Sequence, residues 1–140
     1  MGYLLDTNVL SEARRPLGDE GVRRWISSVP AEDLYLSALV IGEVRRGVER
    51  LRRRDPDQAG VYEAWLATVL SDYADRILPV DAEAAEEWGR MSVPDPVPVL
   101  DGLMAATAKT RGMTFVTRNT ADVERTGTEL LNPFSNGGGA

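Results

Sequence analysis

The stretch Leu4-Leu5-Asp6-Thr7-Asn8 decides the fold, because a short apolar strand there ends directly in an acid. Residues 2–5 are predicted to form a buried strand, and Thr7 or Asn8 is expected to cap a helix that runs to about residue 14. Brief apolar strands then alternate with segments of helical periodicity. Further strands are expected at residues 34–36, 76–80, 114–117 and 128–131. Further helices are expected at residues 19–29, 38–54, 58–73, 82–91 and 98–111.

This alternation is typical of an α/β fold with a parallel sheet that helices cover on both faces. The length of 140 residues suits one domain, which we expect to span residues 1–134. The glycine-rich end, residues 135–140, is predicted to be a flexible tail. In such sheets, ligands bind beyond the carboxyl ends of the strands. Two polar sites are expected at that edge, Asp6 after the first strand and Thr117-Arg118-Asn119 after the fourth.

Composition excludes several kinds of chemistry. The chain has no histidine and no cysteine, so a Ser-His-Asp triad, a thiol nucleophile, a His- or Cys-ligated zinc and a ribonuclease with paired histidines are impossible. Charges interrupt the apolar segments and the N-terminus lacks a basic region before a long apolar run. We therefore expect no membrane span and no signal peptide, and a cytoplasmic protein is the default prediction.

Positive charge is concentrated in one segment although the net charge is −6. An acidic chain is a poor non-specific binder of nucleic acid. However, an arginine fork matches phosphate oxygens, so a local contact with RNA stays open, and a solvated helix face is the plainer alternative. The clustered residues are Arg45, Arg46, Arg50, Arg52, Arg53 and Arg54.

Three acids are the candidate ligands of a metal ion. Asp6 follows the first strand, Glu43 lies early in the helix at 38–54, and Asp101 lies in the first turn of the helix at 98–111. A cluster made only of carboxylates suits a hard divalent cation, since Mg²⁺ and Mn²⁺ take oxygen ligands. This pattern indicates metal-assisted attack on a phosphate.

Each acid alone also has a structural interpretation. Asp6 is an ordinary helix-capping aspartate, and Asp101 suits the first turn of a helix because of the helix dipole. Glu43 is spaced to pair with Arg46, Arg50 and Arg54 on one side of a helix. Asn119 and Asp122 follow the fourth strand and are common turn residues, although either is a candidate to assist a metal through water.

The motifs together resemble a PIN domain. They are Leu5-Asp6-Thr7-Asn8-Val9-Leu10-Ser11-Glu12, residues 37–47 with Glu43, Asp101-Gly102-Leu103-Met104-Ala105-Ala106-Thr107-Ala108, and Val116-Thr117-Arg118-Asn119. All four occur in order over residues 3–134. The chain is most similar to VapC-type toxins of bacterial toxin–antitoxin pairs, including the FitB-like branch.

The resemblance implies a three-layer α/β/α sandwich and an Mg²⁺- or Mn²⁺-dependent endoribonuclease. It carries metal-site roles onto Asp6, Glu43 and Asp101. Many relatives have a fourth acid where this chain has Asn119, so Asn119 or Asp122 is expected to take that role through water. The resemblance also implies a VapB-like antitoxin as partner, a homodimer, and RNA as the substrate.

Four more residues are predicted to contact the substrate. Thr7 and Thr117 match polar positions near the family's site, and Arg46 and Arg50 are candidates from the arginine segment. With no imidazole present, the expected nucleophile is a water activated by the metal ion. Hydrolysis would then leave 5′-phosphate and 3′-hydroxyl ends.

Two other functions remain open. One is a PIN-like module that binds without catalysing. The other is an aspartyl-phosphate enzyme with Asp6 as nucleophile. The latter is disfavoured because Asn8 stands where a second acid is needed and Lys109, the only lysine, is expected in mid-helix.

Overall fold

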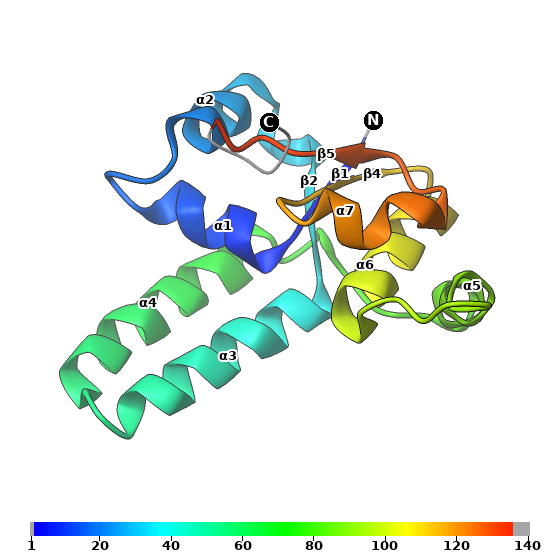
Figure 1. Cartoon of the computed structure of the whole chain (residues 1–140). Helices are drawn as coiled ribbons and strands as arrows, with labels where there is room; N and C mark the ends of the chain where they lie inside the picture. Colours follow the sequence, from blue (N-terminus) through cyan, green and yellow to red (C-terminus); the bar gives the residue numbers. More distant parts are fainter. Residues whose placement is uncertain (1, 136–140) are drawn as a thin grey trace.

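The computed structural model describes residues 2–135, within which the chain forms five strands, seven α-helices and two short 3-10 turns (Figure 1). The strands are β1 (Tyr3–Leu5), β2 (Leu34–Ser37), β3 (Ile77–Leu78), β4 (Thr114–Val116) and β5 (Leu130–Leu131). The helices are α1 (Thr7–Arg14), α2 (Glu20–Ser28), α3 (Ala38–Arg52), α4 (Pro56–Asp72), α5 (Ala82–Met91), α6 (Val99–Thr110) and α7 (Thr120–Val123). The 3-10 turns are η1 (Ala31–Asp33) and η2 (Glu124–Thr126).

All strand pairs are parallel, in the order β3-β2-β1-β4-β5. Leu4 of the central strand lies between Tyr35 of β2 and Phe115 of β4. Because crossovers between parallel strands are right-handed, connections that move in opposite directions along the sheet cover opposite faces. Figure 1 shows α1, α3 and α4 on one side of the strands and α5 and α6 on the other. The predicted α/β/α sandwich with a short parallel sheet is confirmed.

The core is built on the three central strands. Leu4, Leu5, Leu36, Phe115 and Val116 are fully buried. This explains why the strands are continuous apolar runs, since a parallel sheet is covered on both faces. A rigid, buried sheet fixes the position of whatever side chain follows each strand.

The cap of the first helix differs from the expectation. Neither Thr7 nor Asn8 caps α1; Asp6 does so, and its side chain accepts a hydrogen bond from the Val9 backbone N–H. The cap at Thr7 or Asn8 was wrong by one or two residues, whereas the interpretation of Asp6 as a helix-capping aspartate is confirmed. A carboxylate directly before the helix can bond the orphan N–H groups of the first turn. Asp81 caps α5 in the same way, since its side chain accepts a hydrogen bond from the Ala84 backbone N–H.

Other differences concern short elements. The short elements α7, η1 and η2 were not predicted, and β3 and β5 contain two residues each where longer strands were predicted at 76–80 and 128–131. Helices of four residues or fewer carry no full period of apolar residues, so the pattern cannot reveal them. Ser135 donates hydrogen bonds from its backbone N–H and its hydroxyl to Asp19, while the rest of the predicted tail, residues 136–140, lies outside the described residues.

None of the helices within residues 2–135 has the length and apolar character that crossing a bilayer requires.

Gly102 allows α5 to pack closely against α6, and this contact predicts a measurable effect. A Cβ atom at Gly102 would lie 2.5 Å from Val97 Cγ2 and 3.0 Å from Trp88 Cδ1. We expect Gly102→Ala to lower the free energy of unfolding by about 1–3 kcal/mol, because overpacking outweighs the higher helix propensity of alanine. Chemical denaturation measures this.

Gly89→Ala is the matched control, since a Cβ atom at Gly89, in α5, meets nothing within 4 Å. It should raise the free energy of unfolding by about 0.5–1 kcal/mol. Equal effects of the two substitutions would contradict the assigned contact.

Candidate active site

A cavity of about 470 Å³ opens at the carboxyl ends of the central strands. It is lined by polar residues that come from the start of α1 directly after β1, from α3, α6 and the loop after β4, with apolar residues from α6. Among the lining residues are Asp6, Thr7, Glu43, Asp101, Met104 and Asn119. The three acids that the sequence places 37 and 58 residues apart therefore face one space.

Asp6 is the most firmly held of the three acids. Its backbone N–H donates to the Val116 carbonyl at 3.0 Å, which continues the β1–β4 ladder by one residue. One carboxylate oxygen accepts from the Val9 N–H at 2.9 Å, and the other accepts from the Thr117 hydroxyl at 2.6 Å. Asp6 is thus both the cap of α1 and a buried wall of the cavity, with 3% of its surface exposed.

Burial shifts the protonation of this site. Burial raises the pKa of Asp6 to about 6, and the hydrogen bonds from Thr117 and Val9 only partly oppose this. The negative charges of Asp101 and Glu43 make smaller contributions to this rise in the pKa of Asp6. Within residues 2–135, none of the three acids forms an ion pair with Lys or Arg. The cavity therefore carries negative charge that lacks a cationic partner.

Glu43 is oriented by Thr7. It is half-buried in the second turn of α3, and its carboxylate accepts a hydrogen bond from the Thr7 hydroxyl. The alternative in which Glu43 pairs with Arg46, Arg50 or Arg54 is wrong for the described residues. The Thr7 bond turns Glu43 towards the cavity that Asp6 lines.

Asp101 completes the group from the other side of the sheet. It is the third residue of α6 and is half-buried. Burial raises the pKa of Asp101, as do the charges of Asp122 and Glu43, while Asn119 lowers it. Asp122 is exposed and Asn119 lines the cavity. Asn119 is therefore better placed than Asp122 to act inside this space.

The carboxylate oxygens of the cavity are suitable ligands for a hard divalent cation, although the three acids do not surround a single position. Within residues 2–135, no three acidic side chains lie close enough to ligate a single ion together. Mg²⁺ commonly keeps several waters and takes only one or two carboxylates directly. A cavity of this size leaves room for such waters. The observation that favours a cation here is a group of carboxylate oxygens whose negative charge has no cationic partner among the described residues.

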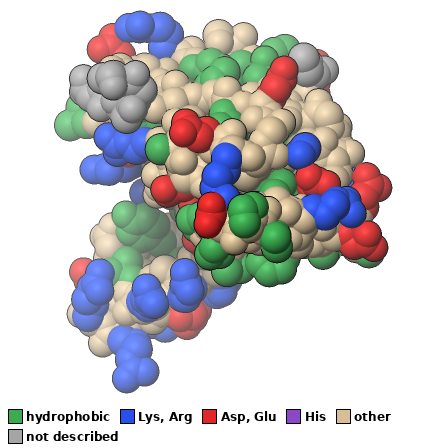
Figure 2. Space-filling view, turned by 45° about the vertical axis from the view of Figure 1, so that its right-hand side comes forward, with side chains coloured by type: hydrophobic (Ala, Val, Ile, Leu, Met, Phe, Trp, Pro, Cys, Tyr) green, Lys and Arg blue, Asp and Glu red, His purple; other side chains and the backbone are tan. Residues whose placement is uncertain are grey.

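The four predicted substrate contacts fall into two pairs. Thr7 and Thr117 both donate to acids, and Thr117 is fully buried, so these bonds favour a role in orienting the carboxylates. Arg46 and Arg50 are exposed on α3. Arg46 lines a hollow of about 230 Å³ that also includes Glu43 and Leu100. Figure 2 shows basic side chains gathered on the arm that α3 and α4 form, and these are arginines, since the only lysine, Lys109, lies in α6.

The Thr117 hydroxyl gives a second testable prediction. The hydrogen bond that the Thr117 hydroxyl donates to Asp6 lowers the pKa of that acid, and Thr117→Val removes this bond. We expect the pKa of Asp6 to rise above about 6 and the fold to lose about 1–3 kcal/mol at pH 8, because a buried acceptor is left unpaired. Titration of the Asp6 carboxyl by NMR and chemical denaturation measure the two effects. Thr117→Ser keeps the hydroxyl, and a similar shift in that variant would contradict the explanation.

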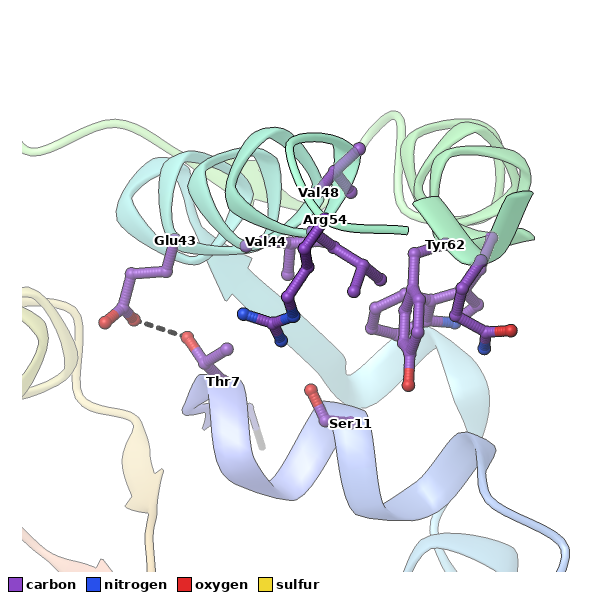
Figure 3. A pocket seen from close by; sticks show the side chains of 11 residues that line it. Thr7, Ser11, Glu43, Val44, Val48, Arg54 and Tyr62 are labelled. Atoms are coloured by element: carbon purple, nitrogen blue, oxygen red, sulfur yellow. Dashed lines mark hydrogen bonds between the residues drawn. The ribbon is translucent and has the colours of Figure 1, made fainter. Parts of the chain in front are cut away.

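A second cavity of about 440 Å³ adjoins the first. It lies between α1, α3 and α4, and it shares Thr7 and Glu43 with the acid cavity. Figure 3 shows Arg54 and Tyr62 in this cavity, beside the Thr7–Glu43 hydrogen bond. Arg54 was predicted to contact RNA, to pair with Glu43 or to lie on a solvated helix face, and helical spacing alone does not indicate this cavity.

Comparisons with known proteins agree with this geometry. Residues 3–128 match the model of the PIN domain. The chain is 35% identical over 136 residues to Toxin FitB of Neisseria gonorrhoeae, covering 94% of this chain and 97% of that protein. It is 32% identical over 139 residues to VapC ribonuclease Y4jK of Sinorhizobium fredii, covering 94% and 96%. The crystal structure of FitAcB from Neisseria gonorrhoeae is similar with a TM-score of 0.85 at 35% identity, covering 94% of this chain and 97% of that one.

Proposed function

Because the chain belongs to the PIN domain family, we propose that it is an endoribonuclease, the toxin of a type II toxin–antitoxin pair of the VapC type. The observation that carries the proposal is the convergence of Asp6, Glu43 and Asp101 on one cavity without a cationic partner among the described residues. The family match and the relatives named as a toxin and a ribonuclease support the same conclusion.

Asp6 and Asp101 would hold Mg²⁺ or Mn²⁺, and Glu43 would ligate it directly or through water. When bound, the cation supplies positive charge and Lewis acidity at the scissile phosphate. Thr7 keeps Glu43 turned towards the cavity, and the Thr117 hydroxyl orients Asp6 and favours its ionised form. Asn119 would contact the phosphate or a water with its amide.

The reaction is a hydrolysis. The oxygen of a water molecule bonds to phosphorus, the bond from phosphorus to the 3′ oxygen breaks, and that oxygen takes up a proton. A route through the 2′-hydroxyl driven by imidazoles is closed, because the chain has no histidine. The products are a 5′-phosphate and a 3′-hydroxyl.

Two partners follow from this proposal. A small VapB-like antitoxin would bind the toxin, and a cationic side chain from it would suit the clustered carboxylates, since charge-assisted hydrogen bonds between guanidinium and carboxylate are strong. We also propose a homodimer and a cytoplasmic location, as expected for a protein that acts on cellular RNA.

A test of the activity uses the purified full chain and a short single-stranded RNA. We expect cleavage with Mn²⁺, no cleavage with EDTA, and 5′-phosphate ends in the products. RNA binding without cleavage would favour the alternative of a non-catalytic PIN-like module, which gains some support from the open arrangement of the acids and from Asn119.

The aspartyl-phosphate alternative is less favoured by the contacts. Both carboxylate oxygens of Asp6 accept hydrogen bonds. The Lys109 ammonium donates to Glu87 and to the Thr126 carbonyl, and Lys109 does not line the acid cavity. Trapping of a phosphorylated Asp6 would revive this alternative.

A further inference from the structure

The cavity between α1, α3 and α4 has the features of a second binding site beside the acids. Its apolar wall contains Val44, Val48 and Leu51 of α3, and its far wall contains the rings of Tyr62 and Trp65 of α4. Ser11 and Gln58 add hydroxyl and amide groups that can donate or accept hydrogen bonds. An apolar surface with a few polar groups is typical of sites that hold a small flat group.

Arg54 brings a cation without a carboxylate partner to this cavity. Within residues 2–135 it forms no ion pair, whereas Arg45 and Arg52 of the same segment both pair with Glu49 and Glu63. Figure 3 shows the Arg54 guanidinium above α1, between the Thr7–Glu43 bond and the Tyr62 ring. A guanidinium in this position is available to an anion that extends from the acid cavity.

The two cavities form a continuous path. They adjoin at Thr7 and Glu43, which line both of them, so a chain molecule with a phosphate beside Asp6 would pass the Thr7–Glu43 bond to enter the second cavity. Gly47 leaves additional space in the wall, because a Cβ atom there would meet nothing within 4 Å.

We infer that this cavity holds the nucleotide next to the scissile phosphate of a single-stranded RNA, with its phosphate on Arg54 and its base against the apolar and aromatic wall. The inference rests on the proposed ribonuclease function. RNA is favoured over a peptide segment because each nucleotide pairs a phosphate with a flat ring, which matches the guanidinium and the wall together. An apolar peptide would leave the charge of Arg54 without a partner.

The first test changes the charge. In an Asp6→Asn chain, whose cleavage should be strongly reduced, binding of a short labelled single-stranded RNA is measured by fluorescence anisotropy with Mn²⁺ at several salt concentrations. Arg54→Gln should weaken binding about tenfold and reduce the slope of log K against log salt by about 0.7, the value for one phosphate contact on a single strand. Arg53→Gln is the matched control, since Arg53 is also exposed but does not line the cavity, and it should change neither quantity.

The second test fills the space. Gly47→Leu should weaken RNA binding at least about tenfold by occupying the cavity, while the open surroundings of Gly47 let the fold accept the new side chain. Gly60→Leu is the matched control, because Gly60 of α4 is equally open but does not line the cavity. Circular dichroism melting shows whether both variants fold.

The results separate this inference from the proposed function. If the wild-type chain cleaves RNA, but Arg54→Gln and Gly47→Leu bind it as their controls do, the RNA site is wrong. The same holds if these substitutions weaken only the binding of a co-purified antitoxin, which would assign the cavity to a peptide. If the wild-type chain neither binds nor cleaves RNA, both proposals fail.

Discussion

Asp6→Asn is expected to reduce RNA cleavage by about 10²–10³-fold or more while the fold stays intact, because it removes a charged group from the centre of the site. The structure explains why the fold survives. Asparagine is as good a helix cap as aspartate, so the bond from the Val9 N–H is kept. The Thr117 hydroxyl then accepts from the new amide in place of donating to the carboxylate.

Asp81→Asn is the matched control for this prediction. Asp81 caps α5 with a carboxylate oxygen 2.9 Å from the Ala84 N–H, the same distance as in the Asp6 cap, but it does not line the acid cavity. Cleavage rates with Mn²⁺ and melting temperatures are measured for both variants. Cleavage by Asp6→Asn at the wild-type rate would contradict the assignment of the site.

Acid pH is expected to produce the second large effect. Since the pKa of Asp6 is about 6, this carboxyl becomes protonated just below neutral pH and no longer attracts a cation. We expect the cleavage rate to fall about tenfold per pH unit below pH 6, or roughly 30-fold by pH 4.5, because each unit reduces the ionised fraction tenfold. Initial rates across this range at saturating RNA and sub-saturating Mn²⁺ measure the effect, since a bound cation would hold the carboxyl ionised, and a flat profile down to pH 4.5 would contradict it.

The stability of the metal-free protein should fall as the pH rises, whereas the cleavage rate should rise. A carboxyl whose pKa rises from 3.8 to about 6 on folding binds its proton more tightly in the folded state. Its contribution to stability is complete below pH 3.8 and is lost as the pH rises through 6, at a cost on the order of 3 kcal/mol for a shift of this size. Asp6→Asn should therefore flatten the pH dependence of unfolding and stabilise the fold at pH 8.

Most of the fold follows from the apolar strands. Short, continuous apolar runs are typical of strands in a sheet that is buried on both faces. Such runs contain Leu4, Leu5, Phe115 and Val116, and all four residues are fully buried. Boundaries were less predictable. β3 and β5 contain two residues each, and strand propensity over longer apolar stretches does not show where pairing stops.

The acids of the site were predictable and their hydrogen-bond partners were not. Asp6 follows β1, and Glu43 and Asp101 lie in the first two turns of α3 and α6. The carboxyl end of the strand and the amino ends of the helices meet at one edge of the sheet, and the three acids line one cavity. The bonds Thr7–Glu43 and Thr117–Asp6 join residues 36 and 111 positions apart, and single-sequence patterns report only local spacing.

Arg54 illustrates the limit of helical spacing. The spacing from Glu43 places it on the same side of a helix, but α3 ends at Arg52. The turn after the helix carries Arg54 out of that register and into the wall of the second cavity. A residue just beyond a helix end is not placed by the period of the helix.

The most direct test of the central claim is a titration of the purified full chain with Mn²⁺, followed by the electron paramagnetic resonance signal of the free ion. The wild-type chain should bind Mn²⁺, and Asp6→Asn, Glu43→Gln and Asp101→Asn should each weaken binding, the two aspartate variants by at least about tenfold. Asp81→Asn should leave binding unchanged. If all three site variants bind Mn²⁺ as tightly as the wild-type chain, the three carboxylates do not form a metal site.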